Sequence, residues 1–298
     1  MEPLITRRGL LKTGAAGAVG LAGAQAFAQP AAPQPAAGKN AGNDPFGGFI
    51  LGVQSYSFRN FGLEQALTKT RELGLHFIEF FRQHVPVNST DAQIHGFRNL
   101  CFQYDITPIA FGVENFSKDH AANRRTFEFA RKLGVRYLTA DPSPDSFDSL
   151  DRLVSEFGIG IAIHPHGPQG KRLHRWYSAE VITKAVSSHH RLIGTCLDTG
   201  HLIRSAQPPF NEKLDPVQQI RLMGARNFGL HLKDHDNQKR TDVVYGRGVL
   251  NVPEVLRALR AINFQGYISI EYEANPNNPS PDMQACVDVF KDSVRKIG

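Results

Sequence analysis

Cysteine is scarce in this sequence. The three cysteines among 298 residues are an odd and sparse set, which gives no disulfide framework. Cys101 falls in a predicted helix and Cys196 in an apolar strand, so we expect both to be small buried side chains. After the N-terminal segment no run of 18 unbroken apolar residues occurs, so we expect no membrane span there. The net charge of +6 permits anionic ligands without demanding nucleic acid.

A glycine-rich phosphate loop is also missing. Residues 57–62, after the first apolar run, read Ser-Phe-Arg-Asn-Phe-Gly, whereas an open doubly wound sheet usually places Gly-x-Gly-x-x-Gly there. The chain instead repeats a short apolar strand and an amphipathic helix eight times, which predicts one closed (β/α)₈ TIM barrel. The predicted strands are Ile50–Tyr56, His76–Phe81, Thr107–Val113, Tyr137–Asp141, Gly160–His164, Ile193–Asp198, Phe228–Leu232 and Tyr267–Glu271.

Residues 1–28 have the pattern of a cleavable export signal. Thr6 to Lys12 resembles the twin-arginine motif, an apolar run follows, and Ala26-Phe27-Ala28 fits a cleavage site. Residues 29–46 are rich in Pro, Ala, Gly and Asn and are predicted to be a flexible linker before the barrel domain, residues 47–298. We therefore expect export through the twin-arginine pathway and a periplasmic or secreted location.

Four consecutive predicted strands run apolar and then reach a metal-binding type of residue. These residues are His164, Asp198, His231 and Glu271. Because the carboxyl ends of barrel strands meet at one face, the four side chains are expected to converge there. Two imidazoles and two carboxylates suit Mn²⁺, Co²⁺, Zn²⁺, Fe²⁺ or Ni²⁺, and suit Ca²⁺ poorly. One such histidine alone would more often be an ordinary core residue; four together predict a metal site.

Three segments resemble the xylose isomerase-like TIM barrel superfamily, the sugar phosphate isomerase and epimerase group. They are residues 197–201 (Leu-Asp-Thr-Gly-His), 231–234 (His-Leu-Lys-Asp) and 268–271 (Ile-Ser-Ile-Glu). A weaker likeness lies in residues 246–248 (Gly-Arg-Gly), and the whole extends from Ile50 to the C-terminus. The resemblance implies that Asp198, His231 and Glu271 bind a divalent metal and that His201 contacts substrate.

The fifth predicted strand departs from this pattern. Many ketose epimerases of the family carry a glutamate where this chain has His164, and the run His164-Pro165-His166 looks more like the inosose dehydratase branch. An imidazole in place of a carboxylate removes one negative charge and one carboxylate base. Epimerisation by two glutamates is therefore doubtful for this chain.

The expected chemistry is proton abstraction next to a carbonyl of a sugar or polyol, assisted by the metal. Glu271 or His164 is the candidate base, and Lys233 could donate to an oxyanion or a leaving group. The sequence also offers candidate substrate-binding residues, for several of which a salt bridge or a packed loop is an equal alternative: His166, His201, Glu79, Glu114, Trp176 and Arg247.

Several functions stay open at this point. Isomerase or epimerase activity on a keto-sugar is close to dehydratase or lyase activity on inososes or 3-keto-glycosides. A sugar-binding barrel without catalysis is a weaker alternative. A DNA-repair endonuclease of the endonuclease IV type is disfavoured, because residues 240–246 lack the histidine of its Asp-x-His pair. We expect a small-molecule partner and no nucleic acid; a homodimer is one option.

Overall fold

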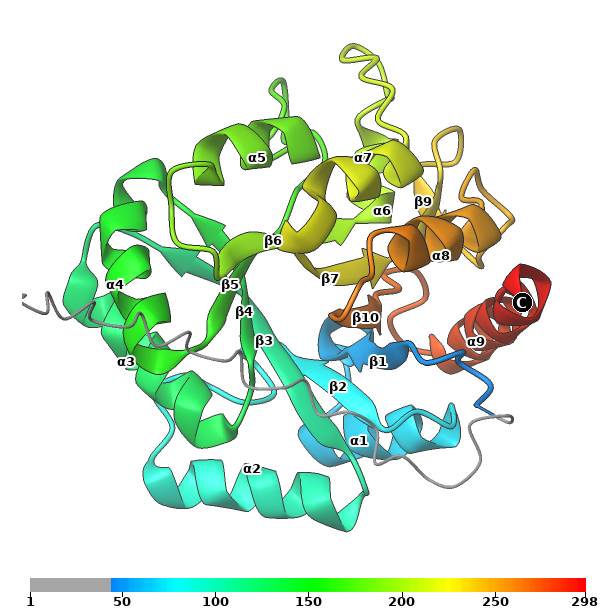
Figure 1. The fold of residues 1–298 in the computed structure, drawn as a ribbon. Coiled ribbons are helices and arrows are strands. Elements are labelled where there is room, and N and C mark those ends of the chain that lie inside the picture. The colour runs from blue at the N-terminus through cyan, green and yellow to red at the C-terminus, as the bar shows by residue number, and fades with distance from the viewer. Residues whose placement is uncertain (1–43) are drawn as a thin grey trace, which may run out of the picture. The chain divides into compact units, whose positions relative to one another are not determined.

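The computed structural model describes residues 44–298, so the predicted export signal and most of the predicted linker lie outside the described residues. Eight strands pair in parallel and close in the order β1-β10-β7-β6-β5-β4-β3-β2, at the centre of the ribbon in Figure 1. The predicted (β/α)₈ barrel is therefore confirmed. Its strands are β1 (Ile50–Gln54), β2 (Phe77–Phe80), β3 (Thr107–Phe116), β4 (Tyr137–Pro142), β5 (Gly160–Ile163), β6 (Ile193–Asp198), β7 (Asn227–Leu232) and β10 (Tyr267–Ile270).

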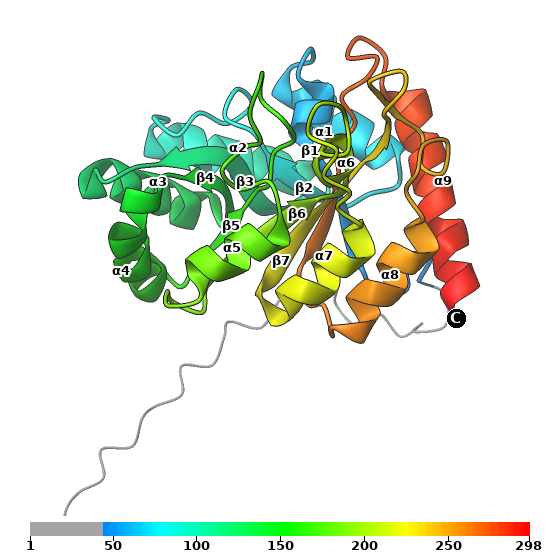
Figure 2. The ribbon, with the colours of Figure 1, turned by 90° about the horizontal axis from the view of Figure 1, so that it is seen from above.

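Helices ring the strands on the outside (Figure 2), because each has an apolar face to bury. In α4, for example, Leu150, Leu153 and Val154 are buried. Gly134 and Gly158 end α3 and α4 at φ of +88° and +66°, a left-handed conformation that favours glycine. The outer helices are α1 (Leu63–Glu72), α2 (Asp91–Gln103), α3 (His120–Leu133), α4 (Phe147–Phe157), α5 (Ala179–Val186), α7 (Pro216–Met223), α8 (Val252–Ala261) and α9 (Ser280–Ile297).

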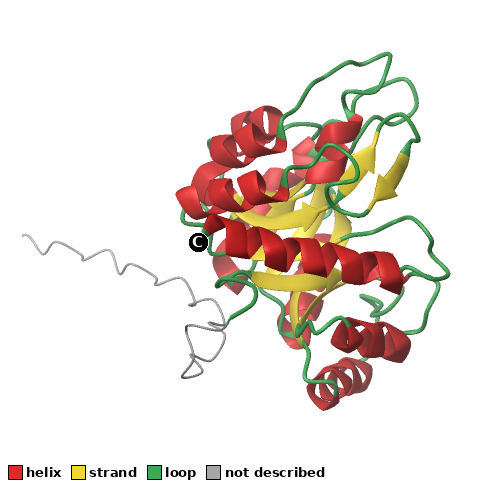
Figure 3. Ribbon diagram, turned by 90° about the vertical axis from the view of Figure 1, so that its right-hand side faces the viewer, coloured by secondary structure: helices red, strands yellow, loops and turns green. Residues whose placement is uncertain are grey.

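Two short additions follow β6 and β7 and were not predicted. The first is helix α6 (Thr199–Arg204), and the second is a hairpin of β8 (Asp234–Asp236) and β9 (Thr241–Val243). Figure 3 shows this hairpin at the end of the barrel opposite to the C-terminus. Both elements are too short and too polar to show a hydrophobic period, which is why the sequence pattern did not reveal them.

The N-terminal end of the described chain packs against the last helix. The rings of Phe46 and Phe49 lie 6.2 and 6.1 Å from the ring of Phe290. The chain therefore already contacts the barrel domain at Phe46, the last residue of the predicted linker. Cys101 and Cys196 are buried and free, as expected. Within residues 44–298, no helix combines the length and the apolar character needed to cross a membrane.

Side chains from neighbouring strands, among them β6, β7 and β10, form a small separate core inside the barrel. Cys196, Phe228 and Tyr267 belong to this small core. Gly194 lies beside it, and a Cβ atom there would come 2.1 Å from the Arg226 carbonyl oxygen and 2.6 Å from the Phe228 ring. The backbone immediately before β7 therefore approaches β6 so closely that only glycine fits at position 194.

We predict that Gly194→Ala lowers the free energy of unfolding by about 1–3 kcal/mol, because the added methyl group overpacks the barrel. The matched control is Gly96→Ala in α2, where an added Cβ meets nothing within 4 Å. That change should instead stabilise the protein by up to about 1 kcal/mol, since alanine favours the helix. Urea unfolding followed by circular dichroism measures both, and equal effects would contradict the close approach.

Candidate active site

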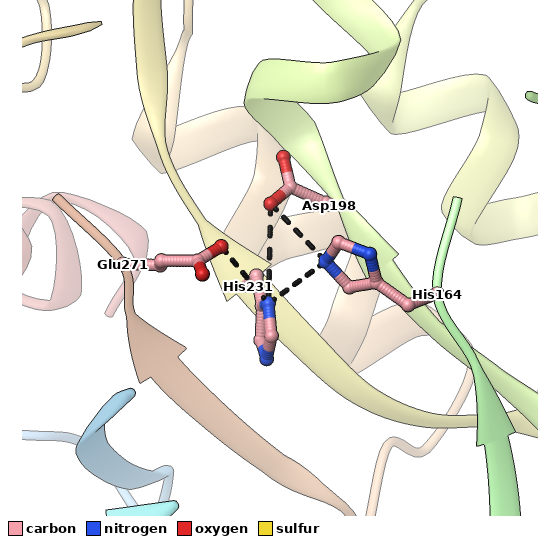
Figure 4. A group of neighbouring side chains, drawn as sticks. All are labelled: His164, Asp198, His231 and Glu271. Atoms are coloured by element: carbon pink, nitrogen blue, oxygen red, sulfur yellow. Dashed lines mark hydrogen bonds and ion pairs between the residues drawn. The ribbon is translucent and has the colours of Figure 1, made fainter. Parts of the chain in front are cut away.

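The four residues predicted as metal ligands meet at the carboxyl ends of the strands. His164 follows β5, Asp198 ends β6, His231 lies in β7 and Glu271 follows β10. One ligand atom from each lies within 4.8 Å of every other, and all four side chains are buried. Figure 4 shows the two rings and the two carboxylates pointing toward one another. The structure thus brings together the complete predicted set.

The spacing between these atoms fits a small divalent ion. His164 Nε2 lies 2.9 Å from His231 Nδ1 and 3.4 Å from Asp198 Oδ2, and His231 Nδ1 lies 3.1 Å from Glu271 Oε2. Neighbouring ligands bonded at 2.0–2.2 Å to a four- to six-coordinate ion are about 3.0–3.5 Å apart. Asp198 Oδ2 is moreover buried and makes no hydrogen bond, although it forms an ion pair with Lys233 Nζ at 3.2 Å. The donor set and this free hydrogen-bonding capacity therefore fit a metal ligand group.

Asp198 has two roles, one for each oxygen. Its Oδ1 accepts a hydrogen bond of 2.7 Å from the backbone N–H of His201 and so caps the N-terminus of α6. Its Oδ2 is the atom that faces the cluster. The capping bond fixes the rotation of the carboxylate, which explains why an aspartate at the strand end is followed directly by a helix.

Glu79 lies behind His231 and orients its ring. The Glu79 Oε2 atom lies 2.8 Å from His231 Nε2 and also accepts a hydrogen bond from Ser269 Oγ, while Thr139 Oγ1 donates to Oε1. A carboxylate that accepts from Nε2–H leaves Nδ1 as the ring atom facing the cluster. Glu79 was predicted to bind substrate; the structure instead buries it completely beneath the cluster.

Lys233, predicted to be catalytic, is also buried beneath the cluster and does not line the pocket. Its Nζ lies 2.8 Å from Glu271 Oε2 and 3.2 Å from Asp198 Oδ2, and it donates to Glu273. Burial opposes the charge of Lys233, but these carboxylates outweigh it and raise the pKa of the ammonium well above its ordinary value. Lys233 is therefore a fixed cation that holds two of the ligand carboxylates in place.

Negative charge nevertheless exceeds positive charge in this buried group. The carboxylates of Asp198 and Glu271 lie beside the ammonium of Lys233, whereas Glu79 lies beside the His231 ring. Burial opposes the charge of His231, but Cys196, Glu79 and Glu271 raise the pKa of its imidazole well above the ordinary value. Burial opposes ionisation of Asp198, but Lys233 and His164 hold the pKa of its carboxyl well below the usual range. Three carboxylate side chains thus outnumber the two cationic groups, and the cluster attracts a further cation.

A pocket of about 360 Å³ opens beside the cluster, and His164 and Glu271 lie in its wall. His166 and His201, both predicted to contact substrate, line it too. Burial lowers the pKa of His166 to about 3 and that of His201 well below its ordinary value, helped by the nearby positive groups. Both rings are therefore neutral near pH 7. The lining residues are Gln54, Tyr56, Phe81, Arg82, Gly112, Val113, His164, His166, His201, Glu271 and Glu273.

Two other predicted substrate contacts lie away from this pocket. Trp176 is buried in the loop after β5, where its Nε1–H donates to the Pro142 carbonyl oxygen at 2.9 Å and its ring packs edge-on against Phe147. Arg247 is exposed in the loop after β9. The structure does not bring either residue into the pocket wall.

Glu114 also lies outside the pocket wall, but it reaches a residue within it. Its carboxylate is buried and accepts two hydrogen bonds from Arg82, at 3.0 and 2.6 Å. Arg82 is thereby the fixed cation at the edge of the pocket, with its charge already paired.

Sequence reasoning missed several lining residues. Gln54 ends β1, where its Nε2 donates to the Gly112 carbonyl oxygen at 3.3 Å. It is the first polar residue after an apolar strand, the same signal that identified Asp198, so the rule could have been applied to β1 as well. Tyr56 lies in the short 3₁₀ helix η1 (Ser55–Phe58) after β1 and Arg82 in the loop after β2, and no sequence pattern marked them.

Asp234, the last residue of the motif at residues 231–234, anchors the loop after β9. Its Oδ1 accepts from the backbone N–H groups of residues 235, 249 and 250, and its Oδ2 from those of Gly246 and Gly248. A Cβ atom at Gly248 would lie 2.4 Å from Asp234 Oδ1. The glycine therefore allows the loop to wrap around the carboxylate, which explains the Gly-Arg-Gly segment.

The chain belongs to the xylose isomerase-like TIM barrel family, since a family model of that description matches residues 67–292. The resemblance inferred from the strand-end motifs is confirmed.

Solved structures show the same fold. A putative uncharacterized protein from Parabacteroides distasonis ATCC 8503 has 28% identity and a TM-score of 0.62, covering 81% of this chain and 97% of that chain. An L-ribulose 3-epimerase has 15% identity and a TM-score of 0.62, covering 83% of this chain and 96% of that chain. The 3-keto-D-glucoside 4-epimerase from E. coli has 15% identity and a TM-score of 0.60, covering 84% of this chain and 98% of that chain. None of the curated proteins matches this chain.

We predict that Asp234→Asn lowers the free energy of unfolding by about 2–3 kcal/mol, because an amide NH₂ would face backbone N–H donors that need a charged acceptor. The matched control is Asp236→Asn, whose carboxylate accepts from the backbone N–H groups of Gln238 and Lys239 and pairs with the exposed Lys239 ammonium at 3.3 Å. This change should alter stability by about 0.5 kcal/mol. Chemical unfolding of both variants measures the difference. Similar losses in the two would rule out a special anchoring role for Asp234.

Proposed function

We propose that this protein is a divalent-metal-dependent isomerase or epimerase that moves a proton next to the carbonyl of a keto-sugar or related polyol. The observation that carries the proposal is the convergence of His164, Asp198, His231 and Glu271 on one point beside a pocket, with His164 and Glu271 in the pocket wall. Two nitrogens and two oxygens favour Mn²⁺, Co²⁺, Zn²⁺, Fe²⁺ or Ni²⁺. When bound there, such an ion supplies a Lewis acid that polarises a carbonyl and stabilises negative charge on its oxygen.

The pocket supports a small, neutral, hydroxylated substrate. Its volume of about 360 Å³ is at the lower end of ordinary ligand pockets. Within the described lining, Arg82 is the one residue with a fixed positive charge, and Glu114 already pairs with it. A phosphate group would find no unpaired cation in that wall. Two structural neighbours, an L-ribulose 3-epimerase and a 3-keto-D-glucoside 4-epimerase, agree by their names with such a substrate.

Glu271 is the better placed of the two candidate bases. Its contacts to His231 and Lys233 both use Oε2, so Oε1 remains to take a proton in the pocket. His164 directs Nε2 into the cluster, and its Nδ1 is buried without a partner. A ring that gives Nε2 to a metal keeps its proton on Nδ1 and has no lone pair left for substrate. We therefore assign proton abstraction to Glu271 and metal binding to His164.

The remaining groups position these residues. Lys233 holds the Glu271 and Asp198 carboxylates, and Glu79 holds His231 with Nδ1 toward the cluster. His166 and His201 are neutral rings in the pocket wall that can accept from, or donate to, substrate hydroxyl groups. The export and periplasmic location predicted from residues 1–28 are part of this proposal, and they fit a substrate without phosphate.

A lyase or dehydratase is the second candidate, favoured by one specific observation. Of the two carboxylates in the pocket wall, Glu271 belongs to the four-residue cluster and Glu273 is bound by Lys233, while His166 and His201 line the same pocket. A single carboxylate base suits removal of a β-hydroxyl or β-glycosyl group as well as proton return, and the neutral rings can hydrogen-bond the departing oxygen.

We predict that the purified protein retains a divalent transition-metal ion that Asp198→Ala and Glu271→Ala remove. The reason is that each variant deletes one of four ligands in a buried group with excess negative charge. Elemental analysis after dialysis measures the metal content. Glu254→Ala, an exposed carboxylate on α8, is the control and should keep the ion. A wild-type protein that takes up no Mn²⁺, Co²⁺ or Zn²⁺ would contradict the mechanism and favour a sugar-binding barrel.

We predict that a keto-sugar substrate exchanges one carbon-bound hydrogen for deuterium in D₂O, and that Glu271→Gln slows the exchange by about 100-fold or more. Glu254→Gln should leave the rate unchanged. Proton NMR follows the exchange and mass spectrometry identifies the product. A deuterated isomer of unchanged composition supports the isomerase or epimerase, whereas loss of water or of a glycosyl group supports the lyase. Full exchange in Glu271→Gln would remove Glu271 from the role of base.

A further inference from the structure

A second group of ligating side chains lies beside the first. Asp141 is in β4, His166 follows β5, and His174 lies in the loop between β5 and α5. One ligand atom from each lies within 4.8 Å of the others. None of these residues belongs to the four-residue cluster, but the rings of His164 and His166 are only 4.7 Å apart between centroids. The two groups are therefore neighbours at the mouth of the barrel.

The contacts within the second group leave ligand atoms unused. His174 Nε2 lies 3.3 Å from Asp141 Oδ2, longer than an ordinary hydrogen bond to a carboxylate, and the His166 and His174 ring centroids are 4.6 Å apart. Asp141 Oδ1 and His166 Nδ1 are buried without a hydrogen-bond partner. Buried polar atoms without partners are uncommon in folded proteins, so each calls for a ligand.

We propose that Asp141, His166 and His174 bind a second divalent transition-metal ion next to the first. Two imidazoles and one carboxylate are a ligand set typical of Zn²⁺ and Fe²⁺ sites that keep open positions. Because His166 lines the pocket, an ion on this group would lie at the pocket wall and offer a second point of attachment for substrate oxygens. The site goes beyond the proposed function, which needs the first ion alone.

Two contacts bear on this site and are compatible with it. Arg175 Nε lies 3.5 Å from Asp141 Oδ1, but its side chain is 47% exposed and can turn to solvent. The backbone N–H of Trp176 lies 3.3 Å from His174 Nδ1, a long hydrogen bond. A ring that binds metal through Nε2 is protonated at Nδ1, so this weak contact would be given up.

The test is the number of metal ions bound by the full-length protein at saturating Zn²⁺, measured by calorimetric titration and by elemental analysis. We expect two ions per chain in the wild type, one in Asp141→Asn, one in His174→Ala and one in Asp198→Ala. The double variant Asp198→Ala/His174→Ala should bind none. His95→Ala, an exposed histidine on α2, is the control for adventitious binding and should keep both ions.

One ion in the wild type, removed by Asp198→Ala, would overturn the second site and leave the proposed function intact. Two ions that both survive Asp141→Asn and His174→Ala would also overturn it. Loss of one ion in His174→Ala with no change in Asp198→Ala would instead support the second site and contradict the first. Circular dichroism checks the fold of each variant; if one variant unfolds, the wild-type stoichiometry and the other variant still decide.

Discussion

Burial of carboxylates at the mouth of the barrel is the constraint on which the rest of the site depends. Glu79 and Asp198 are fully buried and Glu271 almost so. Moving a charged group out of water costs several kcal/mol in a real protein unless partners compensate. Each carboxylate must therefore be surrounded by donors or cations, and that need explains why Lys233, Ser269, Thr139 and the strand-end histidines are placed where they are.

The chain meets this need in two different ways. Neutral donors satisfy Glu79 through both oxygens, and backbone N–H groups do the same for Asp234. Asp198 and Glu271 instead direct one oxygen each toward Lys233 and the histidines. The first kind of carboxylate is part of the scaffold, whereas the second retains capacity for a cation. The two kinds of carboxylate are similarly buried and carry the same charge. Their hydrogen-bond partners therefore distinguish a carboxylate that could bind a cation from one that supports the scaffold.

The sequence predicted the barrel well because the relevant signals are local. Short apolar strands and amphipathic helices give the fold, and β6 has the predicted bounds. The four residues of the cluster could be found because each follows an apolar run. The role of Glu79 could not, since it depends on β2 and β7 facing each other across the barrel interior. Trp176 and His174 lie in one loop, and whether such a residue faces pocket or core is decided by tertiary packing.

The imidazole at position 164 follows from the same charge balance. Three buried carboxylates lie around one fixed ammonium, and Cys196, Glu79 and Glu271 raise the pKa of the buried His231 ring, so a divalent ion bound there would take the place of the His231 proton. A glutamate in place of His164 would add a further negative charge to this buried group. A neutral ligand at the end of β5 and a buried lysine after β7 are therefore matched to each other. This pairing also concentrates the proton chemistry on Glu271, the remaining carboxylate that is both a ligand and part of the pocket wall.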